Sequence, residues 1–238
     1  MASNAVAGYR IGILTLDTAH PLEVGNVQHA ESFAFPVTYA VVRNVSLLAL
    51  MAGDPSAAGP ILEGVAELNS RGVSIIVGAC GSFANYQRLA ADASRVPVFM
   101  SILLEVPFIL RSLPLSAKLG IVFASTSSFT TRVQAECGIE DASRIIAIGA
   151  DAIPAFGSIL KQESSLDSPA LERGTVELTQ RTLREHPEIG AWLLQCSDLP
   201  PYAAAIQRAT SLPVFDAGLL IDHLYRASRR APFSSVPS

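Results

Sequence analysis

The sequence has little charge and no long apolar run. Charged residues make up 16% of the 238 positions, against a usual share of about 25%. The 17 lysines and arginines are outnumbered by 21 aspartates and glutamates, so the basic surface that a nucleic-acid-binding protein needs is missing. The apolar runs stop well before the roughly 20 residues that a membrane-spanning helix requires. We therefore expect neither a nucleic-acid partner nor a membrane.

Cysteine is scarce, and the beginning of the chain does not look like a secretory signal. Three cysteines cannot all pair with one another. The first ten residues, MASNAVAGYR, lack a charged start followed by a long apolar core. These features favour a reduced, cytoplasmic setting in which the cysteines are free thiols.

Motifs for metals and nucleotides are also missing. The four histidines form no i, i+4 pair and have no Cys-x-x-Cys partner, so we expect no metal site. No Gly-rich nucleotide-binding motif and no Gly-x-Ser-x-Gly elbow is present. We therefore expect no cofactor. A Cys/His hydrolase stays open at this point, because any histidine can fold next to a cysteine.

What the sequence does contain is an alternation of strand-like and helix-like segments. Half of the residues are hydrophobic, which is enough for a large core. Short apolar runs predict strands, and segments with apolar residues at helical spacing follow them. This order predicts an α/β fold with mainly parallel sheets and right-handed crossovers. The strands are expected at 9–16, 37–42, 73–79, 96–101, 118–125, 144–150, 191–196 and 212–216, and the clearest helices at 61–72, 83–94, 127–138, 168–186, 200–211 and 218–229.

The two halves of the chain show the same landmarks in the same order. Each has a Gly-Ile strand, a strand ending in cysteine and a Pro-Val-Phe strand, with helices between them. The cysteines stand at 80 and 196, a separation of 116 residues, about half the chain. Although any α/β chain repeats strand and helix, this agreement favours duplication. We predict two pseudo-symmetric lobes, 1–112 and 113–238, with the C-terminal helix free to pack on the first. A ligand is then expected in the cleft between the carboxyl ends of the strands.

Cys80 and Cys196 each end a predicted strand and precede a predicted helix. A helix N-terminus lowers the pKa of a thiol and favours the thiolate. The small residues Gly81, Ser82 and Ser197 follow, and they leave backbone amides open to an anion. A buried structural role is the alternative for each cysteine. Cys137 stands near the end of a helix, before Gly138, and we interpret it as structural.

Other polar residues follow the first strand of each half. Ser125, Thr126 and Ser127 can hold a carboxylate, or one of them can simply cap a helix. Asp17 can meet a substrate amine or act as a cap. The polar segment 20–36 is long for a connection, as lids and binding loops often are, and Asn26 within it is a candidate substrate contact.

Three stretches carry a resemblance to a known family. VGACGSFANY and LLQCSDLPPYAAAIQRATSLPVFD, joined by GIVFASTSSFT, resemble the aspartate/glutamate racemase superfamily from about Arg10 to His223. This superfamily includes amino-acid and hydantoin racemases, maleate isomerases and arylmalonate decarboxylases. The resemblance implies two α/β lobes with the active site between them, working without pyridoxal phosphate, metal or nucleotide.

The resemblance also implies roles for individual residues. Cys80 and Cys196 would be the two acid/base groups that remove a proton from one face of a carbon and return one to the other. The carboxylate of the substrate would be bound by Ser82, Thr126 and Ser197, and the amine by Asp17. The remaining candidates for substrate binding are Asn26, Gly81, Ser125, Ser127 and Asp198. The expected function is therefore a cofactor-independent racemase or epimerase acting next to a carboxylate.

The sequence departs from the family pattern after both cysteines. Gly81-Ser82 replaces a common Asn-Thr, and Ser197-Asp198 replaces Thr-Glu or Thr-His. These changes put aspartate or glutamate as the substrate in doubt. Decarboxylases of the family keep only one of the two cysteines, so the presence of both favours racemisation. Maleate-type isomerases also keep both, and a cis–trans isomerase or related lyase therefore stays open. A binding protein for small carboxylates is the non-enzymatic alternative. The apolar composition leaves room for a homodimer.

Overall fold

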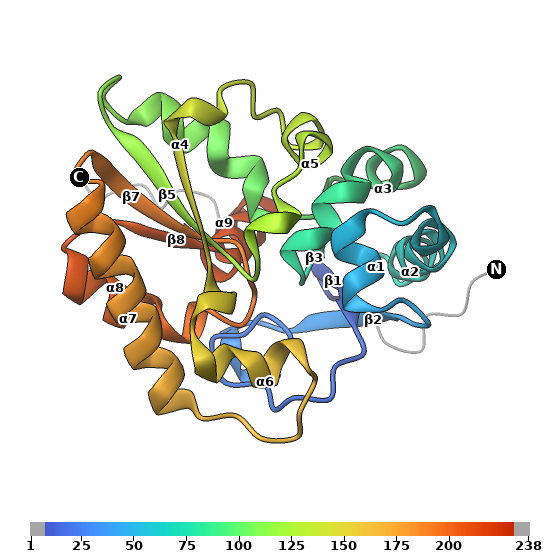
Figure 1. Cartoon of the computed structure of the whole chain (residues 1–238). Helices are drawn as coiled ribbons and strands as arrows, with labels where there is room; N and C mark the ends of the chain where they lie inside the picture. Colours follow the sequence, from blue (N-terminus) through green and yellow to red (C-terminus); the bar gives the residue numbers. More distant parts are fainter. Residues whose placement is uncertain (1–7, 231–238) are drawn as a thin grey trace, which may run out of the picture.

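The chain folds into two four-stranded parallel sheets flanked by helices (Figure 1). The structure, a computed structural model, describes residues 8–230. The segment on which the expectation about a secretory signal depends lies mostly outside these residues. The first sheet contains β1 (Ile11–Leu16), β2 (Val37–Val42), β3 (Ile75–Gly78) and β4 (Val98–Phe99), and the second contains β5 (Lys118–Phe123), β6 (Ile145–Gly149), β7 (Ile189–Leu194) and β8 (Val214–Asp216).

The two sheets have the same strand order. The order is β2-β1-β3-β4 in the first sheet and β6-β5-β7-β8 in the second, and every pairing is parallel. The central strands β1 and β3 are buried along their whole length, which is why their sequences do not alternate between apolar and polar residues. The predicted α/β fold with two matching lobes is confirmed. The lobe boundaries themselves stay a prediction.

Nine α-helices cover the sheets in the described part of the chain. None of them is long and apolar enough to cross a membrane. They are α1 (Leu47–Ala52), α2 (Ala58–Ser70), α3 (Gln87–Ala93), α4 (Val106–Ser112), α5 (Thr131–Glu136), α6 (Gly157–Leu160), α7 (Ser168–Glu185), α8 (Ala203–Thr210) and α9 (Ala217–Ser228).

Three predicted helices begin as 3-10 turns instead. The helix expected at 83–94 is a 3-10 segment, Gly81–Tyr86, followed by α3, and the helix expected at 127–138 is a turn, Thr126–Ser128, followed by α5. The helix expected at 200–211 starts with the turn Pro200–Tyr202, which α8 follows. In the first case the Asn85 amide donates to the carbonyls of Leu50 and Ser82, which holds the chain in a tight turn directly after the strand.

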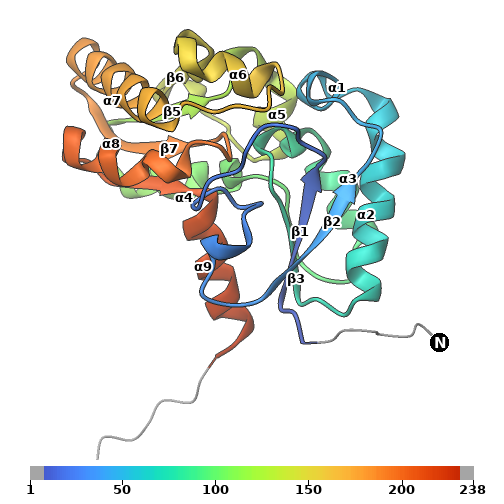
Figure 2. The same cartoon turned by 90° about the horizontal axis from the view of Figure 1, so that it is seen from below.

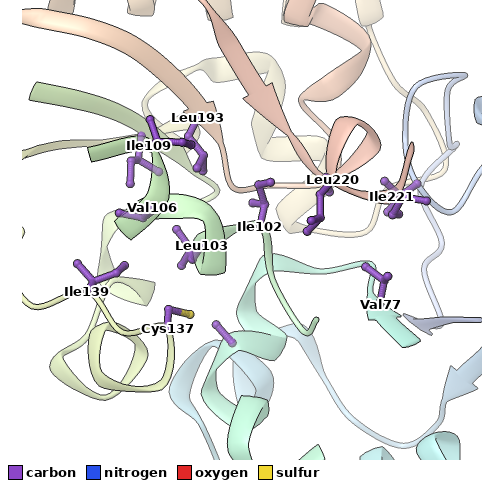
Figure 3. Close-up of a cluster of buried hydrophobic side chains, with 14 of the residues drawn as sticks. Val77, Ile102, Leu103, Val106, Ile109, Cys137, Ile139, Leu193, Leu220 and Ile221 are labelled. Carbon is purple, nitrogen blue, oxygen red and sulfur yellow. The ribbon is translucent and has the colours of Figure 1, made fainter. Parts of the chain in front are cut away.

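The last helix of each half packs against the sheet of the other half. Helix α4 contacts β5 of the second sheet, whereas α9 contacts β1 and β3 of the first (Figure 2). One apolar cluster joins both sheets and both helices (Figure 3). In this cluster, Ile109 of α4 lies beside Leu193 of β7. Ile221 of α9 lies at the same end of the cluster as Val77 of β3. The two lobes therefore share one core.

Candidate active site

A small cavity lies at the carboxyl ends of the strands, between the two lobes. Its volume is about 200 Å³, below the roughly 300–1,000 Å³ of pockets for drug-sized ligands. A ligand enclosed here must therefore be small. The cavity is lined from the first lobe by Leu16, Asp17, Thr18, His20, Gln28, Val45, Ser46, Leu47 and Cys80, and from the second by Ile159, Gln162, Ser197 and Asp198.

The two cysteine-bearing loops meet directly beside this cavity. Gly81 is buried. A Cβ atom placed on it would lie 2.3 Å from the side-chain amide nitrogen of Gln195 and 2.4 Å from its backbone carbonyl oxygen. Only glycine allows this close approach. Because Gln195 immediately precedes Cys196, this contact fixes one cysteine loop against the other. Gly81, a candidate substrate residue by resemblance, thus has a packing role in the structure.

Cys80 lines the cavity and is held as a neutral thiol. Burial raises its pKa to about 11, although hydrogen bonds from the backbone and side chain of Ser82 act in the opposite direction. The negative charge of Asp198 raises it further. Ser82 therefore lies beside the sulfur, 6% exposed, and supports the thiolate whenever it forms.

Cys196 has a different partner, a carboxylate. Its sulfur donates to Asp198 Oδ2 at 3.6 Å. Burial raises the pKa of the Cys196 thiol well above its ordinary value, and the charges of Asp198 and Cys80 add to this. The expectation that a strand-end position lowers the pKa of both thiols is therefore wrong, because the loss of solvation outweighs the backbone amides.

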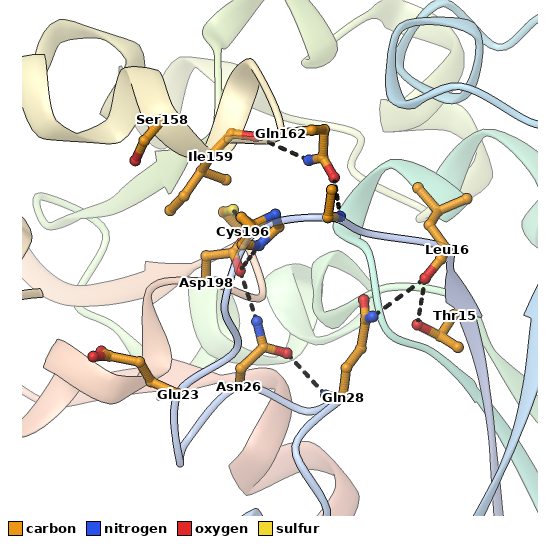
Figure 4. A network of polar contacts seen from close by, with 12 residues as sticks. Thr15, Leu16, Glu23, Asn26, Gln28, Ser158, Ile159, Gln162, Cys196 and Asp198 are labelled. Carbon is orange, nitrogen blue, oxygen red and sulfur yellow. Dashed lines mark hydrogen bonds and ion pairs between the residues drawn. The ribbon is translucent and has the colours of Figure 1, made fainter. Parts of the chain in front are cut away.

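The Asp198 carboxylate is the centre of a buried polar cluster. His20 Nε2 lies 3.0 Å from Oδ1, and the Asn26 amide donates to the same oxygen at 2.7 Å (Figure 4). Burial alone would lower the pKa of His20, but the hydrogen bond and charge of Asp198 outweigh it and raise the pKa. His20 is 5% exposed and was not among the predicted site residues. No spacing rule connects it to a partner 178 positions away.

The segment between β1 and β2 is fastened to the second lobe near its start. The Ala19 amide donates to Gln162 Oε1 at 3.0 Å (Figure 4). Glu23 accepts hydrogen bonds from Ser168 at 2.6 Å and from Tyr202 at 3.1 Å. The long polar loop therefore forms one wall of the cavity and is attached to the opposite lobe.

The structure brings together some of the predicted site residues and leaves others apart. Asp17, Ser197 and Asp198 line the cavity together with Cys80. Asn26 lies behind Asp198, 2% exposed, and does not line the cavity. The hydroxyl cluster of the second lobe is also absent from the lining; it consists of Ser125, Thr126 and Ser127.

The hydroxyl cluster is satisfied within itself, because Ser125 and Ser127 share a hydrogen bond of 3.1 Å. Ile159 and Gln162 form the wall of the second lobe instead. Substrate contact by any of these residues stays a prediction. Cys137 is buried in the shared core, as expected of a structural cysteine.

Apart from His20, the ionisable side chains with a formal charge in the cavity lining are acidic. Asp17 and Asp198 contribute two carboxylates, and among the described residues no lysine or arginine lines the cavity. Thr18, Ser46 and Ser197 add hydroxyl groups. Within residues 8–230, no three His, Cys, Asp or Glu side chains are grouped so that they could hold a metal ion. This lining suits a ligand with a cationic group better than one with two carboxylates.

No family model matches the chain. Individual curated proteins do. Dimethylsulfoniopropionate lyase of Durusdinium sp. clade D is 30% identical over 224 residues, which cover 91% of this chain and 74% of that protein. The chain belongs to the dimethylsulfoniopropionate lyase family. Dimethylsulfoniopropionate lyase 3 of Emiliania huxleyi (strain CCMP1516) is 29% identical over 217 residues, covering 87% of this chain and 56% of the relative. The chain thus spans little more than half the length of this second relative.

The chain shares its fold with solved structures of racemases and of a decarboxylase. Allantoin racemase from Klebsiella pneumoniae has a TM-score of 0.60 at 16% identity, covering 91% of this chain and 88% of that one. Aspartate racemase of Picrophilus torridus has a TM-score of 0.59 at 15% identity, covering 93% and 94%. Unliganded arylmalonate decarboxylase has a TM-score of 0.58 at 15% identity, covering 94% of each chain. The fold expected from the resemblance is confirmed, and at these identities the likeness concerns the fold alone.

Proposed function

We propose that the chain is a lyase that eliminates dimethyl sulfide from dimethylsulfoniopropionate and leaves acrylate. The observation that carries this proposal is the charge of the cavity. Asp17 and Asp198 face it without a lysine or arginine. A dicarboxylate such as aspartate or maleate would meet two like charges there, whereas a sulfonium cation would meet two opposite ones. The names of the relatives supply the sulfonium substrate.

The elimination needs one base and no acid for the leaving group. A base takes the proton from the carbon next to the carboxylate, and its electron pair forms the double bond. The carbon–sulfur bond breaks, its pair stays on sulfur, and the cation leaves as neutral dimethyl sulfide. The thiolate of Cys196 is the proposed base. In the structure the thiol donates to Asp198 Oδ2 at 3.6 Å, which holds the sulfur next to a residue of the cavity lining.

Cys80 has the complementary part. Its pKa of about 11 keeps it protonated at neutral pH, so that it can donate to charge developing on the substrate carboxylate. The hydroxyls of Ser46 and Ser197 line the same cavity and can bind that carboxylate. A bound sulfonium also opposes the charge of Asp198, and this makes the Cys196 thiolate more accessible once substrate is present.

Racemisation, the reaction expected from the resemblance, is the second candidate. It is favoured by two thiols from opposite lobes that lie close enough for the charge of Cys80 to raise the pKa of Cys196. A two-base racemase needs this pairing. The reactions differ in their products, since a racemase inverts a chiral carbon and incorporates solvent deuterium, whereas the lyase releases a gas and an alkene.

The test is incubation of the purified chain with dimethylsulfoniopropionate, with dimethyl sulfide measured by gas chromatography. We expect release by the wild type, and a fall of about 100-fold or more for Cys80→Ser and for Cys196→Ser. Cys137→Ala, changed in the shared core, is the matched control and should keep most of the activity. No release by a folded wild type, with deuterium exchange into an amino acid or hydantoin in D₂O, would reverse the ranking of the two candidates.

A further inference from the structure

The buried histidine behind the site has a hydrogen-bonding pattern that a purely structural role does not explain. His20 Nε2 binds Asp198, while Nδ1 is buried and has no hydrogen-bond partner of normal geometry among the described residues, although the Gln162 side chain lies close to the ring and also raises its pKa. A buried polar atom without a partner is destabilising. Such an atom calls for an explanation, and a role in catalysis is one of those known.

The arrangement around Asp198 links this histidine to a thiol. His20 Nε2 lies on Oδ1 of the carboxylate, and Cys196 Sγ lies on Oδ2 of the same carboxylate. The thiol, the carboxylate and the imidazole therefore form a chain of hydrogen-bonding contacts. This chain runs from the second lobe to the first. Asn26 donates to Oδ1 as well and holds the carboxylate in this orientation.

We propose that His20 is a positioning residue that controls the ionisation of Cys196 through Asp198. The idea rests on the proposed function in so far as Cys196 is taken as the base. The ionised carboxylate of Asp198 opposes a second negative charge on the neighbouring sulfur. When His20 is protonated, the imidazolium and the carboxylate form a neutral pair, and this opposition is removed.

The protons balance within the cluster. In one form it consists of a thiol, a carboxylate and a neutral imidazole, and in the other of a thiolate, a carboxylate and an imidazolium. Both forms carry one net negative charge. The proton lost by Cys196 Sγ is matched by one gained at His20 Nδ1, the nitrogen that has no described partner of normal geometry. The thiolate thus forms without a change in the net charge of the buried site. Adding an unpaired charge to such a site would be costly.

None of the other ionisable groups that the structure describes around Asp198 supplies a positive charge. Asp17 comes from the same loop as His20, Cys80 and Cys196 come from the two strand ends, and each is negative when ionised. Beyond Asp198, Tyr202 and Glu23 add a neutral phenol and a carboxylate. Among the described residues no lysine or arginine lines the cavity. His20 is therefore the basic side chain within this group.

The test is the rate of alkylation of each cysteine by iodoacetamide at pH 8, resolved by peptide mass spectrometry in the intact chain. It uses no substrate, so its outcome does not depend on whether dimethylsulfoniopropionate is turned over. His20→Gln should slow the alkylation of Cys196 about tenfold, equivalent to a pKa rise of about one unit. Cys137 serves as an internal reference, and His223→Gln, on the exposed side of α9, is the matched control and should change nothing.

A double-mutant cycle separates this role from a structural one. Asp198→Asn alone should speed the alkylation of Cys196, because it removes the opposing charge. Adding His20→Gln to Asp198→Asn should then have no further effect. An unchanged Cys196 rate in a folded His20→Gln chain would overturn the proposal, and so would an equal slowing in the Asp198→Asn background. His20→Asn, with its melting temperature checked, gives a second reading should the glutamine variant misfold.

Discussion

Gly81 marks the point at which the two halves of the site come closest. Its backbone lies against Gln195, so that the loop after β3 and the loop after β7 hold each other in place. A glycine that sequence reasoning assigned to the substrate thus also sets the distance between two cysteine-bearing loops.

Gly81→Ala is therefore expected to destabilise the chain. The added methyl group overlaps the Gln195 amide and backbone carbonyl, and overpacking of this kind costs about 1–3 kcal/mol. For a chain of this size each kcal/mol lowers the melting temperature by about 2–4 °C. Differential scanning fluorimetry measures the shift. Gly59→Ala is the matched control, because nothing lies within 4 Å of its added Cβ in helix α2. Equal melting temperatures for both variants would contradict the close approach.

At the same scale, the sequence predicted the location of Cys80 and Cys196 more successfully than it predicted their ionisation. Strand-end position and spacing identified Cys80 and Cys196 as a pair that meets beside one cavity. Their raised pKa values could not be predicted, because burial depends on what the other lobe places over each thiol. His20 was missed for a related reason, since its contact with Asp198 exists only after the lobes have come together.

At the scale of elements, the loop between β1 and β2 is held by contacts to the opposite lobe. Glu23 and Ala19 use partners on α7 and directly after α6, and His20 uses one after β7. The residues that line the cavity near the start of this loop, Asp17 and Thr18, are positioned by these contacts. The length of the loop in the sequence predicted a binding loop, but not its anchors.

Ser168→Ala should loosen this loop without unfolding the molecule. The change removes the shorter of the two hydrogen bonds to Glu23. Hydrogen exchange measured by mass spectrometry should become faster across residues 17–30, while amides of the buried strand β1 keep their rates. Ser143→Ala, an exposed change far along the chain, is the control. Faster exchange in β1 as well would indicate global destabilisation instead.

The positions of the strands along the chain were the most predictable part of the fold. The runs of Ile, Leu and Val at 11–16 and 118–123 are buried on both faces, and such runs are legible in a sequence. Helices α1 and α6 were not predicted because they have six and four residues, too few for an apolar period to appear.

At the scale of the whole molecule, helices α4 and α9 each pack against the sheet of the other lobe, an arrangement that we call the exchange. They join the two lobes through one apolar cluster. Leu220 of α9 is 3% exposed and belongs to the apolar cluster that includes β1, β3, β5 and α4. Sequence periodicity reveals the apolar face of such a helix but not which sheet it will cover. The sequence therefore allowed the C-terminal helix to pack on the first lobe but did not predict that it does so.

The shared core predicts a single unfolding transition. The calorimetric enthalpy of unfolding should equal the van't Hoff enthalpy. The fluorescence of Trp192 in the second lobe should change at the same temperature as the far-UV circular dichroism of the whole chain. Leu220→Ala should lower the stability of the whole by about 2–5 kcal/mol without splitting the transition. Leu219→Ala, at a half-exposed neighbour on the same helix, is the control. Two separate transitions would show that the lobes unfold independently.

The exchange of α4 and α9 also bears on how such a chain can arise. If the halves descend from one duplicated unit, a single unit would have had an apolar sheet face that its own last helix does not cover. Two separate copies could cover both faces only by trading those helices. Each copy would then have given one of the two cysteine-bearing loops that meet beside the cavity, so this pairing of loops would be older than the fusion that now places it in one chain.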